Sequence, residues 1–148
     1  MENELIDGIV SAIYDEFEFS GENAPNKYTY YKNNVEQGLV RPSFYPTAVS
    51  PTFKLLNNNR YQLTCPCVIH YFPQKIGDKG EIYDVGARLM QCLEVVPVGN
   101  DLVRGINMSY EIEDDTLLFY VTYNYIVIKQ VDVAETMNSE EFNGGAKN

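Results

Sequence analysis

The sequence predicts an α/β (α+β) fold, in which a mostly antiparallel, twisted sheet of about four to six strands carries an N-terminal helix and a second helix. Three observations predict it. The segment from Asp114 to Lys129 is dense in β-branched and aromatic residues, which favour extended backbone. Two other segments repeat apolar residues at helical spacing. Finally, an Asn-rich turn and an acidic turn each separate two extended segments, as in β-hairpins.

The segment from Thr116 to Val133 contains neither Gly nor Pro and is expected to form a central strand. A period of two places Leu117, Phe119, Val121, Tyr123, Tyr125 and Val127 on one face, and Leu118, Tyr120, Thr122, Asn124, Ile126 and Ile128 on the other. Both sets are rich in apolar and aromatic side chains. We therefore expect both faces to be covered by a helix, a second sheet or a neighbouring subunit.

An amphipathic helix is expected from about Asn3 to Phe17. Residues 1–22 contain only acidic charges, so we interpret the outer face of this helix as a solvated, uniformly negative surface. After a break at Ser20–Pro25, a short strand is expected at Lys27–Tyr31. The segment Val35–Pro46 contains two prolines that cannot donate to a ladder, which predicts an edge strand or an extended connector.

The middle of the chain predicts a hairpin and a second helix. Extended segments run from Thr52 to Phe72 around the turn Asn57–Asn59. Apolar residues then recur at helical spacing from Ile82 to Val96, and Pro97 and Gly99 are expected to stop that helix. A strand at Asp101–Glu113 and a turn at Asp114 and Asp115 lead into the central strand.

Composition favours one domain, residues 1–133, followed by a flexible polar tail, residues 134–148. The formal net charge of −10 argues against tight nucleic-acid binding, which requires clustered Lys and Arg. Three cysteines without a signal peptide indicate a reducing compartment rather than a disulfide framework. No apolar stretch is long enough to predict a membrane span.

Few residues suggest catalysis or a cofactor. Cys65, Cys67, His70 and Cys92 could in principle hold zinc, but a regular strand places His70 on the face opposite Cys65 and Cys67. We therefore expect no metal, no cofactor and no enzymatic activity, and leave the role of the three cysteines open. The twelve tyrosines suit either a protein interface or the core of a small sheet.

Several motifs, in this order, resemble the tail terminator (tail completion) family of long-tailed bacteriophages and prophages of low-GC Gram-positive bacteria. They are Ile13–Phe17, Val35–Leu39, Arg41–Phe44, Arg60-Tyr61, Ile69–Pro73, Leu93-Glu94, Arg104–Met108 and Phe119–Tyr125. Glu36–Gly38 and His70–Pro73 are the most specific of these. The resemblance spans about residues 5–129, and the Cys65–Cys67 segment departs from it.

The resemblance implies a virion structural protein that assembles as a homo-oligomeric ring, commonly a hexamer, on the head-proximal end of the tail tube. The ring would stop tube polymerisation and form the surface that joins the head or neck. Its partners would be itself, the tail tube protein and neck proteins, after assembly in the host cytoplasm. DNA would pass through the ring without tight binding, and no membrane would be involved. The candidate subunit or tube contacts are Glu36, Gln37, Gly38, Arg41, Arg104 and Gly105, each of which could also serve a turn or the fold.

Two other functions stay open from the sequence. One is a neck (head–tail) connector of the same particle, since such proteins are also small ring-forming domains. The other is a small enzyme or ligand-binding domain, which would need a convergent set of acidic side chains beside His70.

Overall fold

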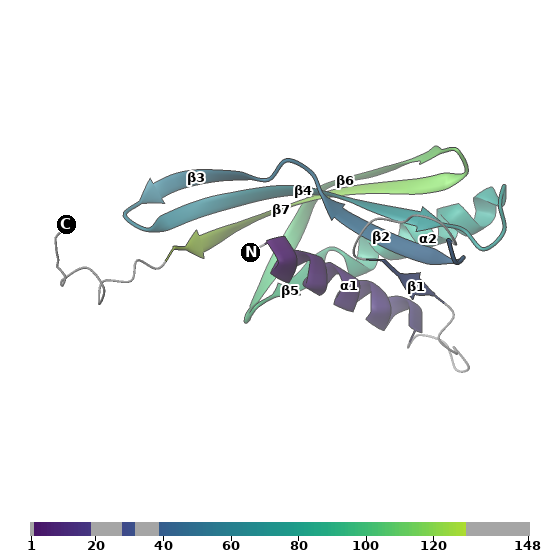
Figure 1. Ribbon diagram of the computed structural model, residues 1–148, viewed down its shortest axis with the longest axis horizontal. Helices are drawn as coiled ribbons and strands as arrows, with labels where there is room; N and C mark the ends of the chain where they lie inside the picture. The colour runs from purple at the N-terminus through teal and green to yellow at the C-terminus, as the bar shows by residue number, and fades with distance from the viewer. Residues whose placement is uncertain (1, 19–27, 32–38, 130–148) are drawn as a thin grey trace. The chain divides into compact units, whose positions relative to one another are not determined.

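In the computed structural model, residues 2–18, 28–31 and 39–129 are described (Figure 1). Their elements, in chain order, are α1 (Glu2–Glu18), β1 (Thr29–Tyr30), β2 (Ser43–Ala48), β3 (Thr52–Asn57), β4 (Arg60–Phe72), α2 (Lys79–Cys92), β5 (Val95–Val98), β6 (Asp101–Glu113) and β7 (Thr116–Ile128). This confirms the predicted class of two helices with a mostly antiparallel sheet.

The sheet has seven strands in the order β1-β2-β4-β7-β6-β5, with β3 paired to β4 beside this path. β7 lies between β4 and β6, as predicted for the central strand. It pairs with β6 in an antiparallel register around a turn in which Asp114 and Asp115 have φ angles of 52° and 61°. β6 carries an irregularity between Ile106 and Ser109, a feature that bends a strand and increases its twist.

Within the chain only one face of the central strand is fully buried, so the expected cover of the other face by a neighbouring subunit stays a prediction. Leu117, Phe119, Val121 and Tyr123 are buried, whereas on the other face Leu118, Tyr120 and Thr122 are half-buried and Asn124, Ile126 and Ile128 are exposed. β4 shows the same alternation, with Leu63, Cys65, Cys67, Ile69 and Tyr71 buried. The core therefore lies on one side of the sheet, the side that the two helices cover.

α1 buries the apolar stripe of Leu5, Ile9, Ile13 and Phe17. At Gly8 the helix approaches β5 so closely that an added Cβ would lie 1.9 Å from the Pro97 carbonyl oxygen. Figure 1 shows α1 running beside β5. The absence of a side chain at Gly8 is what permits this contact.

α2 begins after Asp78, whose Oδ1 accepts a hydrogen bond from the Glu81 N–H at 3.1 Å. It ends at Cys92, with Leu93 as its C-cap, so the prediction that the helix would continue to Val96 was wrong. Val95 and Val96 belong instead to β5, which pairs with β6. β-Branched residues favour a strand once a partner is available, and this tertiary pairing overrides the helical spacing.

β1 lies within the predicted strand Lys27–Tyr31, and β2 overlaps the predicted edge strand or connector Val35–Pro46 only from Ser43 and lies between β1 and β4. β2 pairs with β4 along its whole length, whereas its parallel pairing with β1 joins Thr29 to Ser43 and Tyr30 to Phe44. Pro46 lies beyond that β1 pairing, where a missing N–H is tolerated. The β3–β4 hairpin turns at Asn58 and Asn59, within the predicted Asn-rich segment.

The contacts divide the chain into two compact units. We call Met1–Thr52 with Leu63–Tyr125 the body, and Phe53–Gln62 with Ile126–Asn148 the hairpin unit. The predicted domain end at residue 133 and the predicted flexible tail lie outside the described residues. Among the described helices, none combines the length and apolar character needed to cross a bilayer.

Candidate functional site

Arg41 connects two of the sequence motifs. Its Nη1 donates to the Pro73 carbonyl oxygen at 3.1 Å, and its guanidinium lies 6.0 Å from the centre of the Phe72 ring. The Arg41–Phe44 motif and the His70–Pro73 motif therefore meet where β2 begins and β4 ends. This arrangement gives Arg41 a role within the fold, and its half-buried side chain leaves part of its surface accessible.

Arg104 and Gly105 lie on β6, and their environments differ. The Arg104 side chain is exposed and its Nη1 donates to Glu94 Oε2 at 2.8 Å. Gly105 is crowded, because an added Cβ would lie 2.7 Å from Val121 Cγ2 and 2.8 Å from the Leu93 carbonyl oxygen. Gly105 thus has a packing role in the isolated chain, whereas Arg104 faces solvent.

These candidates do not form one site. β4 and β7 separate β2, which follows Arg41, from β6, which carries Arg104 and Gly105. Glu36, Gln37 and Gly38 lie outside the described residues. The proposed interface role of all six residues stays a prediction.

A carboxylate that the sequence analysis did not single out organises the loop between β4 and α2. Glu81 accepts hydrogen bonds from the Tyr71 hydroxyl at 2.5 Å, the Gln74 N–H at 2.7 Å and the Lys75 N–H at 3.2 Å. Burial and the Glu81 carboxylate raise the pKa of Tyr71, so its phenol stays protonated and donates. With three donors already bound, Glu81 serves the loop rather than acid–base chemistry.

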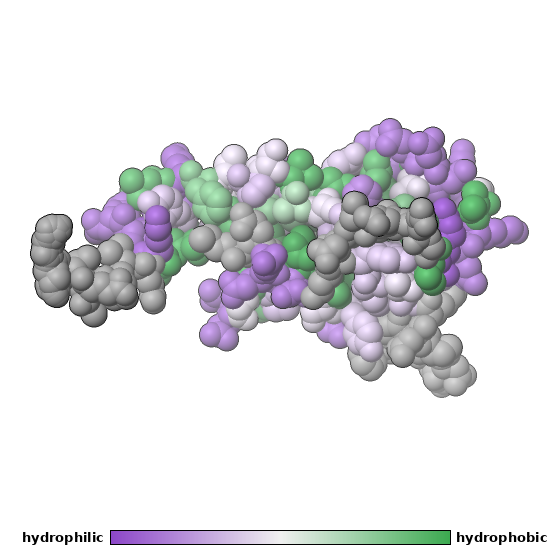
Figure 2. Space-filling view, viewed as in Figure 1, coloured by the Kyte–Doolittle hydropathy of each residue, from purple (hydrophilic) through white to green (hydrophobic). Residues whose placement is uncertain are grey.

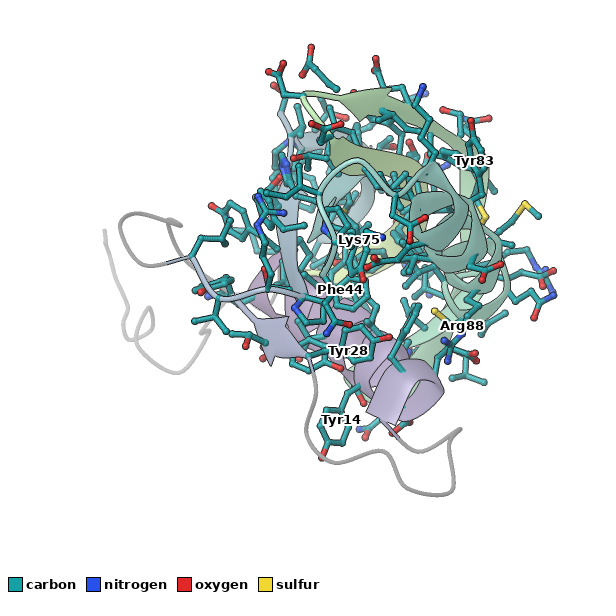
Figure 3. The ribbon with its side chains drawn as sticks, turned by 90° about the vertical axis from the view of Figure 1, so that its right-hand side faces the viewer. Tyr14, Tyr28, Phe44, Lys75, Tyr83 and Arg88 are labelled. Carbon is teal, nitrogen blue, oxygen red and sulfur yellow. The ribbon has the colours of Figure 1, made fainter. Side chains whose placement is uncertain are left out.

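Arg88 joins α2 to the end of α1 (Figure 3). Its Nε donates to Glu16 Oε2 at 3.0 Å, and its Nη2 donates to the Glu16 carbonyl oxygen at 2.8 Å. Its guanidinium also lies 4.1 Å from the centre of the Phe17 ring. Arg88 and Glu81 line a cavity of about 600 Å³ together with Tyr28 and Tyr71. The hydrogen bonds of Glu81 and Arg88 join elements of the body to one another.

Cys65 and Cys67 lie on the buried face of β4 and His70 lies on the other, as predicted from strand alternation. Cys65 and Cys67 are buried free thiols whose sulfur atoms are 3.9 Å apart, and the hydrogen bond with Cys65 and burial raise the pKa of Cys67. Burial and nearby Glu16 raise the pKa of Cys92 to about 12. The His70 ring stacks on the Tyr45 ring, with the two ring centres 5.4 Å apart. Across the described ranges, no group of three or more His, Cys, Asp or Glu residues could hold a metal ion.

The hairpin unit presents large apolar side chains that the sequence analysis did not select. Phe53, Leu55, Leu56, Ile126 and Ile128 are between 45% and 56% exposed, and Figure 2 shows hydrophobic residues on the surface of this hairpin. The Lys129 N–H donates to the Asn59 carbonyl oxygen at 2.8 Å, which fixes the end of β7 to the hairpin turn. The run Thr52–Asn57 gives one sequence signal of this exposure. Its apolar residues do not alternate strictly with polar ones, so they do not define a single buried face.

A second feature lies in the body, where α1 runs along β5. A groove of about 330 Å³ is lined by Ser11, Ala12, Asp15 and Glu16 of α1, together with Cys92, Val95 and Pro97. Asp15, Val95 and Pro97 are exposed. The groove therefore combines carboxylates with an apolar wall, a surface suited to binding a protein rather than to catalysis.

The comparison with protein families decides the kind of protein. The sequence model of a family described as phage tail terminator protein matches residues 4–135. The chain belongs to the phage tail terminator family. As a member of this family it is a structural component of the phage tail, belongs to the virion and interacts with other phage tail or head proteins. Membership favours a structural role over an enzymatic one.

The other comparisons add no functional information about this tail terminator. No curated protein matches. Twenty-two chains of solved structures match. One of them, a protein known only by a sequence number, has 15% identity, a TM-score of 0.35 and coverage of 85% of this chain and 96% of its own. A TM-score this low supports no conclusion about function.

Proposed function

We propose that this protein assembles as a ring, most simply a hexamer, on the head-proximal end of the tail tube. There it stops addition of further tube subunits and provides the surface that the head or neck proteins bind. The match to the tail terminator family over residues 4–135 is the observation that carries the proposal. The partners are other copies of the chain, the tail tube protein and the neck proteins.

Surface properties support a ring. A ring with head-to-tail contacts requires two different, complementary patches on every subunit. The chain offers an exposed apolar surface on the hairpin unit and a groove between α1 and β5 on the body. The described polar clusters around Glu81 and Arg88 are occupied by contacts within the body, so no described catalytic set competes with a binding role.

The charge of the chain supports passage of DNA through such a ring. The formal net charge is −10, and the α1 side chains Glu4 and Asp7 are exposed. A negative lumen repels the phosphate backbone, so DNA would slide through without binding. A ring whose lumen is strongly basic would contradict this part of the proposal.

The test uses the purified full chain and purified tail tubes that can be extended with free tube protein. We expect added chain to bind at one end of each tube and to halt extension, as measured by tube length in electron micrographs. Light scattering should show a closed oligomer, either free or only after capture on tubes. A chain that binds the portal or neck and leaves tube extension unchanged would assign it to the neck connectors instead.

A further inference from the structure

The described strands of the hairpin unit, residues 53–62 and 126–129, differ in charge from the rest of the chain, whereas residues 130–148 of the same unit contain Asp132, Glu135, Glu140 and Glu141. Residues 53–62 and 126–129 contain Lys54, Arg60 and Lys129 and no Asp or Glu, although the chain as a whole has a net charge of −10. Within the described residues, none of these three cations forms an ion pair with a carboxylate. The same short segments expose five large apolar side chains. A basic, apolar surface of this kind is typical of an interface whose partner is acidic and apolar.

The α1–β5 groove of the body has the complementary properties. Its acidic side is formed by Asp15, which is exposed, and Glu16, which already pairs with Arg88. Its apolar wall is formed by Val95, which is 38% exposed, and Pro97. Leu102 extends this wall, because it lies opposite Pro97 in the β5–β6 register and is 75% exposed.

The acidic turn between β6 and β7 is a poorer acceptor. Glu111, Glu113, Asp114 and Asp115 cluster at the β6–β7 turn, but a turn projects outward and offers no groove. Glu111 also already accepts a hydrogen bond from the Tyr120 hydroxyl at 2.7 Å. The larger cavity beside Arg88 also has an exposed carboxylate, Asp84, but its lining includes the cation Arg88 and its aliphatic residue Val85 is buried. The α1–β5 groove combines a hollow, an exposed carboxylate and exposed apolar side chains.

We propose that the hairpin unit of one chain docks in the α1–β5 groove of a second copy, with Arg60 facing Asp15 of that copy. Arg forms strong, directional contacts with carboxylates, and the exposed Phe53 and Leu55 supply the apolar part of the contact. Every copy carries both halves, so the contact repeats head to tail and can close a ring. The inference rests on the proposed ring and names the surfaces that build it.

Charge reversal tests the pairing. Arg60→Glu and Asp15→Lys should each weaken self-association roughly tenfold or more, because each places like charges opposite one another. The double variant Arg60→Glu with Asp15→Lys should restore association. Mixing the two single variants should also restore it, because an Arg60→Glu hairpin then meets an Asp15→Lys groove, and the unchanged halves meet each other. Lys79→Glu, an exposed charge reversal in the first turn of α2, is the control and should assemble as the unaltered chain does.

A second pair of variants tests the apolar contact. Leu55→Ser should weaken association, whereas Ile76→Ser should not, although Ile76 is the more exposed at 62% against 55%. Masses are measured by light scattering of the full chain, alone and on tail tubes, and thermal unfolding confirms that each variant folds.

The outcomes separate this inference from the proposed function. Rings that persist in Arg60→Glu, Asp15→Lys and Leu55→Ser would overturn the docking assignment alone. If Arg60→Glu still forms rings but no longer binds tail tubes, the docking assignment is overturned, and the hairpin unit contacts the tube instead. Oligomers that depend on the hairpin unit but leave tube extension unchanged would support the docking and overturn the capping role. An unaltered chain that stays monomeric both free and with tubes would overturn both.

Discussion

The substitution Gly105→Ala separates a packing role from an interface role at a residue that the sequence analysis assigned to a contact. An alanine Cβ would lie 2.7 Å from Val121 Cγ2, 2.8 Å from the Leu93 carbonyl oxygen and 3.1 Å from Tyr123 Cε1. The Leu93 oxygen cannot easily move, because it accepts a hydrogen bond from the buried Tyr123 hydroxyl at 2.7 Å. The next carbonyl, that of Glu94, accepts a hydrogen bond from the Gly105 N–H at 2.8 Å.

Overpacking of this kind costs about 1–3 kcal/mol, and the lower entropy of unfolded alanine offsets about 0.5–1 kcal/mol of it. We therefore expect the free energy of unfolding to fall by about 1–2 kcal/mol, which lowers Tm by about 2–8 °C in a chain of this length. Thermal and urea unfolding measure the change. Gly80→Ala is the control, since Gly80 lies in the first turn of α2, where alanine favours the helix.

The refuting result is a Gly105→Ala protein that unfolds like the unaltered chain but no longer assembles. Gly105 would then act at a contact between chains and not in packing. Loss of both properties would leave packing as the cause, because a distorted β6 would disturb any surface built on it.

Three further predictions concern the body. Glu81→Ala should lower the free energy of unfolding by about 2–4 kcal/mol, since the Tyr71 hydroxyl and two loop N–H groups lose their shared acceptor. An unchanged midpoint of urea unfolding would contradict this. Arg88→Met should lower the free energy of unfolding, measured by the same urea titration, by only about 1 kcal/mol. The ion pair with Glu16 is partly exposed, and the methionine keeps contact with Phe17. A loss of folding would show that the guanidinium contacts contribute more than this. Burial lowers the pKa of His70, so the unfolded chain binds a proton more readily than the folded chain does. The free energy of unfolding should therefore fall as the pH drops below about 6.5. A His70→Gln variant should lose less of this free energy between pH 7.5 and 5.5, and equal losses would contradict the argument.

Much of the fold followed from local patterns. β7 has a long, uninterrupted extended preference, β6 is extended apart from Gly105 and Asn107, and the turn between them contains two residues that tolerate positive φ. α1 follows its apolar spacing closely, from Glu2 to Glu18. These elements are defined by signals that do not depend on distant residues.

The misplaced elements depend on distant partners. Val96 continues the helical spacing of α2, but β6 provides a strand partner at that position. The outer face of β7 is rich in apolar residues without being covered within the chain. Local sequence does not show which of two competing partners a segment will meet.

The candidate site was less predictable than the fold. Arg41 was selected by resemblance, and its contacts with Phe72 and Pro73 were not apparent from spacing. Glu81 and Arg88 gather partners from 6 to 72 positions away in the chain, so no short motif indicates them. The exposed hairpin unit was read as an ordinary hairpin, because burial is a property of the folded chain.

The contact between Gly8 and Pro97 has a consequence for how sheets of separate chains can meet. The hydrogen bond from the Gly105 N–H to the Glu94 carbonyl sets the alternation of the β5–β6 ladder, so the Pro97 carbonyl points away from β6 toward the open side of the terminal strand. On that side Pro97 has no N–H to donate, and α1 lies against its oxygen at Gly8. A foreign strand would therefore find neither a donor nor a free acceptor there, and the sheet cannot lengthen from one molecule to the next at this position. The first helix of the chain therefore blocks edge-to-edge growth of its sheet at Pro97.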